Sequence, residues 1–132
     1  MSTIVIAVRP RGKARARVTT RGTYTPDSTV QAEKMIGEHW KAMRGGSWPS
    51  GVPLVMVVLA TFKRTKRNPP AGSYHTQRPD ADNIWKLAAD ALNHVAYEDD
   101  SQIAVGRCVK MWGDADSLSI TVEALEPPES RP

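Results

Sequence analysis

Acidic and basic side chains recur at short spacing in one stretch of the second half of the chain. Within residues 80–100 they are Asp80, Asp82, Lys86, Asp90, Glu98, Asp99 and Asp100, with Arg78 just before them. A helix, which turns about 100° per residue, would place Asp82, Lys86 and Asp90 on one side. Carboxylates on a shared surface can hold a hard divalent cation, and a neighbouring lysine can stabilise charge that develops on a phosphate. The residue types therefore indicate metal-assisted chemistry on phosphate.

The other side of the same stretch is apolar. At helical spacing it carries Ile84, Leu87, Ala88, Ala91, Leu92 and Val95. This periodicity predicts an amphipathic helix with one face that packs and one face that presents charge. The acidic cluster at residues 98–100 would lie just past the end of that helix.

Two familiar carboxylate motifs do not fit this stretch. A calcium loop needs an oxygen ligand at its fifth position and glycine at its sixth, where this chain has Ile84 and Trp85. A phosphatase that uses the first aspartate as its nucleophile would carry it at the end of a buried strand. Here the mainly polar residues 73–79 precede Asp80.

Helix capping is a purely structural alternative. Asp80 or Asp82 would stabilise the positive end of the helix dipole, and Lys86 would pair with Asp82 and Asp90 four residues away. Capping explains one carboxylate but gives no reason for the acids at the far end.

A divalent metal does give a reason. Mg²⁺, or Mn²⁺ as a substitute, takes a few carboxylate ligands and completes its shell with water and phosphate oxygens. Asp80, Asp82 and Asp100 with Lys86 beside them would form a site for phosphodiester cleavage, provided that Asp100 folds back beside the helix N-terminus.

Charge is unevenly distributed along the 132 residues, although the net charge is only +4. Residues 1–67 hold 13 Lys or Arg against 3 acids, whereas residues 68–132 hold 5 against 11. The basic half favours a polyanionic partner, and the acidic half would repel that partner unless cations occupied its carboxylates. An ordinary solvated surface with uneven charge is the alternative.

The basic residues form two clusters. The first contains Lys13, Arg15, Arg17 and Arg21, and the second contains Lys63, Arg64, Lys66 and Arg67. In an extended chain the first cluster would line one side and match the phosphate spacing of nucleic acid. Charge protection of an edge strand is the alternative. The second cluster opens a long aperiodic loop that leads directly to Asp80, and such loops are typically functional or disordered.

Elements that could position these residues follow from the hydrophobic pattern. We expect strands at residues 3–8, 52–62, 103–111 and 118–124, and helices that begin at Thr25-Pro26 and near Asp80. The nearly all-apolar strand 52–62 should be central and covered on both faces, and the last two strands should form an antiparallel hairpin. The predicted fold is a single α+β domain over residues 1–132, with a small mixed sheet, the order β-α-β-α-β-β, and a loose tail at 126–132.

Features outside residues 78–102 indicate the cellular compartment and the possible roles of Cys108 and His75. The single cysteine, Cys108, lies in an expected strand, which favours a buried thiol and a reducing compartment. No apolar run approaches a membrane span, and the N-terminus lacks signal-peptide features, so we expect a soluble cytoplasmic protein without a membrane partner. His75 could contact DNA or the scissile phosphate, or be an ordinary loop histidine.

Several motifs together resemble one known family. RPDADN with Lys86, Asp90-Ala91-Leu92, residues 98–103 and the segment KARARVTTRGTYTP closely resemble the RusA family of Holliday junction resolvases, endodeoxyribonucleases of bacteria, phages and prophages. The resemblance extends from about Lys13 to Ile103.

This resemblance implies a RusA-like fold and a Mg²⁺-dependent homodimer that makes paired nicks across four-way DNA junctions in recombination and repair. It carries metal binding onto Asp80, Asp82 and Asp100 and the catalytic lysine role onto Lys86. Asp90 matches a family acidic position. Because the spacing after Asp90 is one residue shorter than in the family, Asp99 is an alternative third ligand and Glu98 a further candidate.

Two-fold symmetry gives the dimer an independent rationale, since it places equivalent sites on opposing strands of a junction. The alternatives are a non-catalytic DNA-binding or regulatory protein on the same fold, and a nuclease that acts on flaps or forks. A bacterial cytoplasm is expected, with a phage or prophage gene as one origin.

Overall fold

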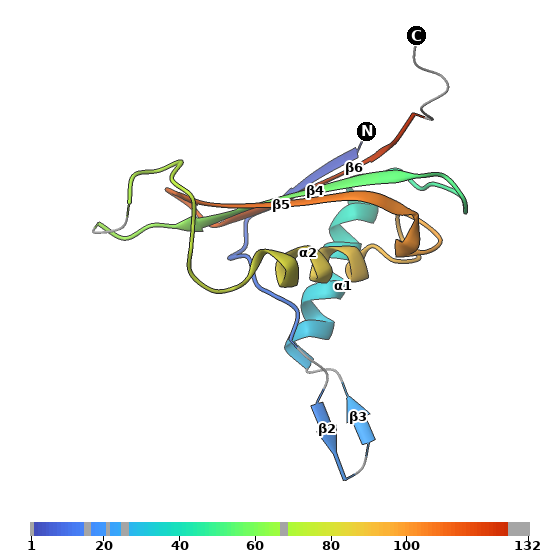
Figure 1. Cartoon of the computed structure of the whole chain (residues 1–132), viewed down its shortest axis with the longest axis horizontal. Helices are drawn as coiled ribbons and strands as arrows, with labels where there is room; N and C mark the ends of the chain where they lie inside the picture. Colours follow the sequence, from blue (N-terminus) through green and yellow to red (C-terminus); the bar gives the residue numbers. More distant parts are fainter. Residues whose placement is uncertain (1, 15–16, 21, 25–26, 67–68, 127–132) are drawn as a thin grey trace.

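A four-stranded mixed sheet with both helices on one side forms the body of the protein (Figure 1). The computed structural model describes residues 2–14, 17–20, 22–24, 27–66 and 69–126. The sheet has the order β1-β6-β4-β5, with β1 at Ser2–Ile6, β4 at Leu54–Lys63, β5 at Ile103–Gly113 and β6 at Ser117–Ala124. Helices α1 and α2 comprise Asp27–Ala42 and Ala81–Ala91. The predicted α+β class, mixed sheet and element order are confirmed.

The first basic segment adds an element that was not predicted. It forms a separate two-stranded antiparallel sheet from β2, Arg17–Thr19, and β3, Gly22–Tyr24. This hairpin projects away from the body of the molecule beyond α1 (Figure 1). Thr25-Pro26, the predicted helix start, and residues 127–132 of the predicted tail lie outside the described residues.

The predicted hairpin between the last two strands is wrong. β5 pairs in parallel with β4, and β6 pairs antiparallel with β4 on its other side, so β4 separates them. The ten-residue β4 can pair along both edges, and its end binds the connection between β5 and β6. Lys63 N donates to Asp116 Oδ1 at 2.7 Å, and Arg64 N donates to the Gly113 carbonyl at 2.9 Å.

The two faces of β4 differ, which corrects the expectation that this strand would be covered on both faces. Leu54, Met56, Val58, Ala60 and Phe62 are fully buried. The alternate residues of β4 up to Thr61 point to the opposite face and are only half-buried. Helices α1 and α2 lie on one side of the sheet, so no helix of the described residues covers the opposite face (Figure 1).

Helix α2 keeps its predicted amphipathic character but ends earlier than the apolar stripe suggested. Ile84, Leu87 and Ala88 are buried, as the periodicity predicted. The helix ends at Ala91, and His94 adopts a left-handed backbone with φ of 64°. The chain therefore turns back before the 3₁₀ helix η1, Asp100–Gln102.

The turn after α2 is fastened to the helix that it leaves. The Tyr97 hydroxyl donates to the Ala89 carbonyl at 2.5 Å, and Tyr97 is buried. His94 N donates to the Tyr97 carbonyl at 2.9 Å. These contacts determine the direction in which the acidic cluster leaves the helix.

The described part of the chain contains no helix that is both long enough and apolar enough to cross a membrane.

Candidate active site

The N-terminus of α2 presents two carboxylates without partners. Asp80 is the N-cap residue, but its side chain makes no capping hydrogen bond. Asp82 lies in the first turn, and both residues are exposed. Among the described residues, neither carboxylate has a hydrogen bond or an ion pair. Capping therefore does not use the Asp80 carboxylate, and the predicted Lys86–Asp82 pair does not form.

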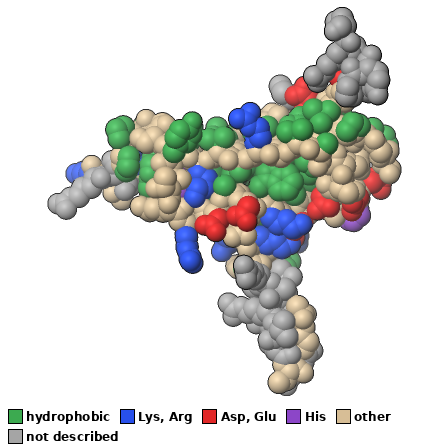
Figure 2. All heavy atoms as spheres, in the orientation of Figure 1, with side chains coloured by type: hydrophobic (Ala, Val, Ile, Leu, Met, Phe, Trp, Pro, Cys, Tyr) green, Lys and Arg blue, Asp and Glu red, His purple; other side chains and the backbone are tan. Residues whose placement is uncertain are grey.

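Charged groups further along α2 are instead connected in a chain of ion pairs. Lys86 Nζ lies 3.2 Å from Asp90 Oδ1 and 3.7 Å from Asp100 Oδ2. Lys13 Nζ pairs with Asp90 Oδ2 and lies 3.4 Å from Glu33 Oε1. The order is thus Glu33, Lys13, Asp90, Lys86, Asp100, with alternating sign. Acidic and basic side chains lie next to each other below the sheet at the level of α2 (Figure 2).

The acidic cluster after α2 folds back toward the middle of the helix, whereas the metal hypothesis required Asp100 to lie beside the helix N-terminus. Asp100 approaches Lys86, whereas Asp99 caps η1 by accepting a hydrogen bond from Ser101 N at 3.0 Å. Hydrogen bonds from Ser101 hold the pKa of the Asp99 carboxyl below its usual value. Glu98 is exposed. The geometry therefore brings Asp100, rather than Asp99, into the chain of ion pairs.

Gln102 holds the acidic cluster at residues 98–100 in place, a role that was not predicted from the sequence. Its Oε1 accepts from Glu98 N at 3.0 Å and from Asp99 N at 3.1 Å, while its Nε2 donates to the carbonyls of Pro49 and Val52 at 2.9 and 3.1 Å. The Asp-x-x-Gln spacing is a capping-box pattern, so the sequence does contain a signal for this turn.

Lys13, predicted to bind DNA, lies against α2 and pairs with Asp90. Its backbone N donates to the Asn83 carbonyl at 3.0 Å, and Ala14 N donates to Thr29 Oγ1 at 3.3 Å. Burial alone would lower the pKa of Lys13, but the hydrogen bond and charge of Asp90, together with Glu33, raise it above its usual value. Lys13 is therefore a charged member of the ion-pair chain.

The remaining cations of the basic clusters differ in their surroundings. Arg64 Nε pairs with Asp114 Oδ1 at 3.0 Å, and Lys63 and Lys66 are exposed. Arg15, Arg21 and Arg67 lie outside the described residues, and only the backbone of Arg17 is described. The exposed lysines remain available to a phosphate backbone.

His75 is packed in the interior. It is 4 % exposed and stacks on Phe62 with ring centroids 3.9 Å apart, while Trp112 lies 4.5 Å away. Neither ring nitrogen has a hydrogen-bond partner within the described chain. Burial first, and then the charges of Lys110 and Arg9, lower its pKa. In this conformation the imidazole does not face solvent or the carboxylates.

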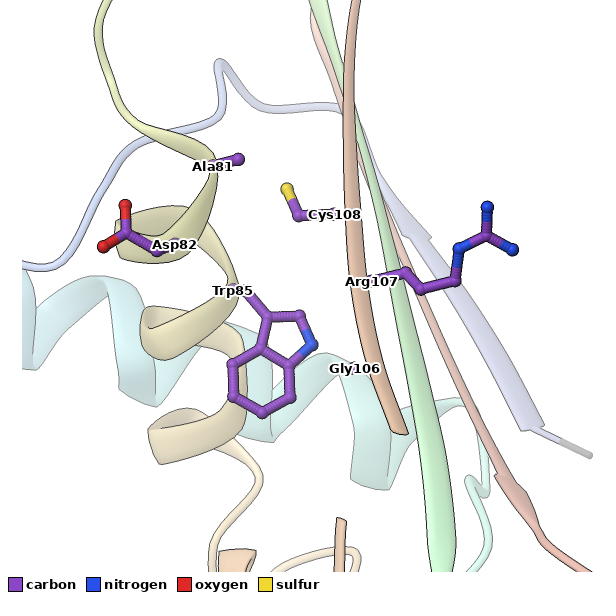
Figure 3. Close-up of a pocket in the computed structure, with 6 residues that line it drawn as sticks. All are labelled: Ala81, Asp82, Trp85, Gly106, Arg107 and Cys108. Carbon is purple, nitrogen blue, oxygen red and sulfur yellow. The ribbon is translucent and has the colours of Figure 1, made fainter. Parts of the chain in front are cut away.

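An apolar cleft of about 390 Å³ lies between α2 and β5 (Figure 3). Trp85 leaves no room for a side chain at Gly106, since a Cβ there would lie 2.6 Å from Trp85 Cζ2. The Asp82 carboxylate points away from this cleft, and Cys108 points into it (Figure 3). Burial raises the pKa of Cys108 to about 11, which keeps the thiol protonated near neutral pH. The cleft therefore adjoins the N-terminus of α2, where Asp82 is one of its lining residues.

The donor set suits a hard cation, although the carboxylates are not gathered around one point. No group of three or more His, Cys, Asp or Glu side chains within the described ranges is close enough together to hold a metal ion. Asp80 and Asp82 nevertheless offer free carboxylate oxygens, which Mg²⁺ and Mn²⁺ prefer. Asp100, the third predicted ligand, is held against Lys86.

The fold and side chains define a small α+β domain that presents unpaired carboxylates beside a lysine on its second helix. The chain matches the family Endodeoxyribonuclease RusA over residues 7–123 and belongs to that family. It is also 34% identical over 50 residues to the "Uncharacterized protein YqaN" of Bacillus subtilis (strain 168). That match covers 38% of this chain and 35% of the relative, so it spans about a third of each protein.

Proposed function

We propose that the protein is a Mg²⁺- or Mn²⁺-dependent endodeoxyribonuclease that resolves four-way DNA junctions in recombination and repair. Membership of the RusA endodeoxyribonuclease family supports nuclease chemistry. The observation that carries the proposal is the pair of exposed, unpartnered carboxylates of Asp80 and Asp82 next to a lysine that contacts Asp100. A helix N-terminus with two free carboxylates costs self-repulsion, which a bound cation would remove.

In this mechanism Asp80, Asp82 and Asp100 would hold the ion. When bound, it would lower the pKa of a coordinated water and offset charge on the leaving oxygen. Lys86 donates hydrogen bonds to the phosphate in the transition state. Asp90 and Asp100 limit where its half-exposed ammonium can reach. The exposed Lys63 and Lys66 contribute sequence-independent attraction to the DNA backbone.

We also propose that the active form is a homodimer. A two-fold dimer matches the approximate symmetry of a four-way junction and would supply one active site for each of the two nicks. The sheet face opposite the helices supports this proposal, because half-buried Val55 on β4 lies beside exposed Val105 on β5, and half-buried Leu59 lies beside Val109. Light scattering during size-exclusion chromatography should give twice the mass of one chain, and a monomer at micromolar concentration would contradict the proposal.

The decisive experiment compares labelled DNA substrates at one salt concentration. A four-way junction, a flap, a fork and a linear duplex are incubated with the protein in Mg²⁺, Mn²⁺ or EDTA. We expect paired nicks in the junction with either metal and none in EDTA. Absence of cleavage of every branched substrate would overturn the nuclease proposal and leave a DNA-binding role. Preferential cutting of flaps or forks would change the substrate.

Charge-removing variants connect the cleavage to the site. Asp82→Asn should abolish nicking while junction binding stays equal or becomes tighter, because one carboxylate less repels the phosphates. Asp114→Asn is the matched control, since Asp114 is an exposed carboxylate that pairs with Arg64 in the connection between β5 and β6. Circular dichroism should show both variants folded. An unfolded Asp82→Asn protein would instead favour a structural role for this carboxylate.

A further inference from the structure

Asp90 binds two different lysines through its two oxygens. Oδ1 lies 3.2 Å from Lys86 Nζ, and Oδ2 pairs with Lys13 Nζ. The two lysines come from distant parts of the chain, with Lys13 in the segment between β1 and β2 and Lys86 in the middle of α2. Asp90 therefore couples the N-terminal segment to the lysine that we assign to catalysis.

The backbone of Lys13 contacts α2, and its side chain is less exposed than that of Lys86. The Lys13 backbone binds the Asn83 carbonyl, and the preceding Gly12 packs closely on α2, because a Cβ there would make a tight 3.0 Å contact with Asn83 Cβ. The Lys13 side chain is 28% exposed, whereas that of Lys86 is 54% exposed. Lys13 is thus a fixed charge, and Lys86 is the lysine that can reach a substrate.

The surroundings of Lys13 are those of a structural cation and not of a phosphate contact. Its ammonium lies between Asp90 and Glu33, so most of its charge is already balanced. A phosphate would have to displace one of these carboxylates, both of which would repel it. Lys66, by contrast, is exposed and has no acidic partner among the described residues.

We propose that Lys13 is a positioning residue for Lys86 and that it acts through Asp90. With Lys13 in place, one oxygen of Asp90 is occupied, and Lys86 is held between the other oxygen and Asp100. Without Lys13, both oxygens of Asp90 attract Lys86, which draws its ammonium toward Asp90 and away from Asp100 and the substrate phosphate. The inference rests in part on the proposed nuclease function, in which Lys86 contacts that phosphate.

The test measures the cleavage rate and the junction affinity separately. The variants are Lys13→Met, Lys13→Arg and, for comparison, Lys66→Met. Single-turnover cleavage of a four-way junction is measured with saturating enzyme and Mg²⁺, and junction affinity is measured in Ca²⁺ over a series of salt concentrations. We expect Lys13→Met to slow cleavage by roughly tenfold, less than the roughly 10²- to 10³-fold loss for removing a transition-state partner itself, with its salt slope unchanged. Lys13→Arg should recover most of the rate.

Lys66→Met should behave differently, with weaker junction binding and a salt slope smaller by about one. An unchanged cleavage rate for Lys13→Met would overturn the inference. So would a smaller salt slope for Lys13→Met, because that result would make Lys13 a phosphate contact.

A double-mutant cycle tests the role of Asp90 without relying on cleavage. Urea unfolding of Lys13→Met, Asp90→Asn and the double variant should show strong coupling, with the double variant nearly as stable as Asp90→Asn alone. Additive losses would mean that Lys13 does not act through Asp90 and would overturn the inference. This result is independent of activity, so it distinguishes a failure of the positioning role from a failure of the proposed nuclease function. If Lys13→Met does not fold, the Lys13→Arg protein is compared with Asp90→Asn in both assays.

Discussion

Two pairs of carboxylates on the same side of the molecule have opposite surroundings. Asp80 and Asp82 are exposed and have no partner within the described chain, whereas Asp90 and Asp100 both contact Lys86. Asp90 also binds Lys13. Removing a paired carboxylate leaves a cation without its partner, while removing an unpaired one relieves repulsion. The paired acids therefore stabilise the fold and hold the lysine, and the unpaired acids remain available to a ligand.

The largest effect expected from this comparison is on catalysis. Asp80→Asn should lower cleavage of a four-way junction by at least roughly 10²-fold, the scale for losing one electrostatic partner of a transition state. Its stability should change little, because the Asp80 side chain makes no capping hydrogen bond. Rates with Mg²⁺ and urea unfolding of the same preparation provide the two readouts. A stable variant with full activity would remove Asp80 from the site.

The next effect concerns stability and should distinguish the paired carboxylates. Asp90→Asn should lower the free energy of unfolding by about 1–2 kcal/mol, because Lys13 and Lys86 both lose a partly buried partner. Urea unfolding with Asp82→Asn as the control measures the difference. If the two variants had the same free energy of unfolding, the paired and unpaired carboxylates would not differ in their contribution to stability.

Local patterns in the sequence were sufficient to predict much of this arrangement. The apolar stripe of α2 predicted which residues are buried, and its polar side correctly grouped Lys86 with Asp90. The metal hypothesis required Asp100 to return beside the N-terminus of the helix; the structure brings Asp100 back to Lys86 in the middle of α2. These features depend on helical periodicity and on a short connection, so nearby residues determine them.

Long-range pairings were less predictable. In the sequence, Lys13 is one of several cations in a basic segment, and its ion-pair partner Asp90 is 77 residues away. Similarly, the last two strands have the alternation and the turn of a hairpin, but β4 pairs with each of them and separates them. Alternation predicts which side chain faces the core and does not specify the neighbouring strand. The positions of Lys13 and β4 therefore required the three-dimensional structure.

A smaller effect is expected where the acidic cluster is held against α2. Tyr97→Phe removes the hydroxyl that donates to the Ala89 carbonyl, and should lower stability by about 1 kcal/mol, the usual value of such a hydrogen bond. Asp100 follows this turn, so Mg²⁺-dependent cleavage should also weaken while junction binding in Ca²⁺ is unchanged. Tyr74→Phe is the control, because the exposed Tyr74 lies in the loop before α2. Unchanged activity in Tyr97→Phe would show that Gln102 alone holds Asp100.

His75 provides the last contrast, since its polar atoms are unpaired but buried. Its lowered pKa means that the unfolded chain binds a proton more readily than the folded protein near and below the ordinary histidine value of 6.5. The contribution of His75 to stability is therefore retained above that pH and falls as the pH decreases toward the folded-state pKa.

The variant His75→Phe should keep the stack on Phe62, and its free energy of unfolding should rise by up to about 1 kcal/mol at pH 7. The pH dependence of urea unfolding between pH 5 and 7 should be lost. Cleavage should be unaffected. A stable variant without activity would instead give His75 a part in the reaction and show that an unpaired polar group marks function even in the interior.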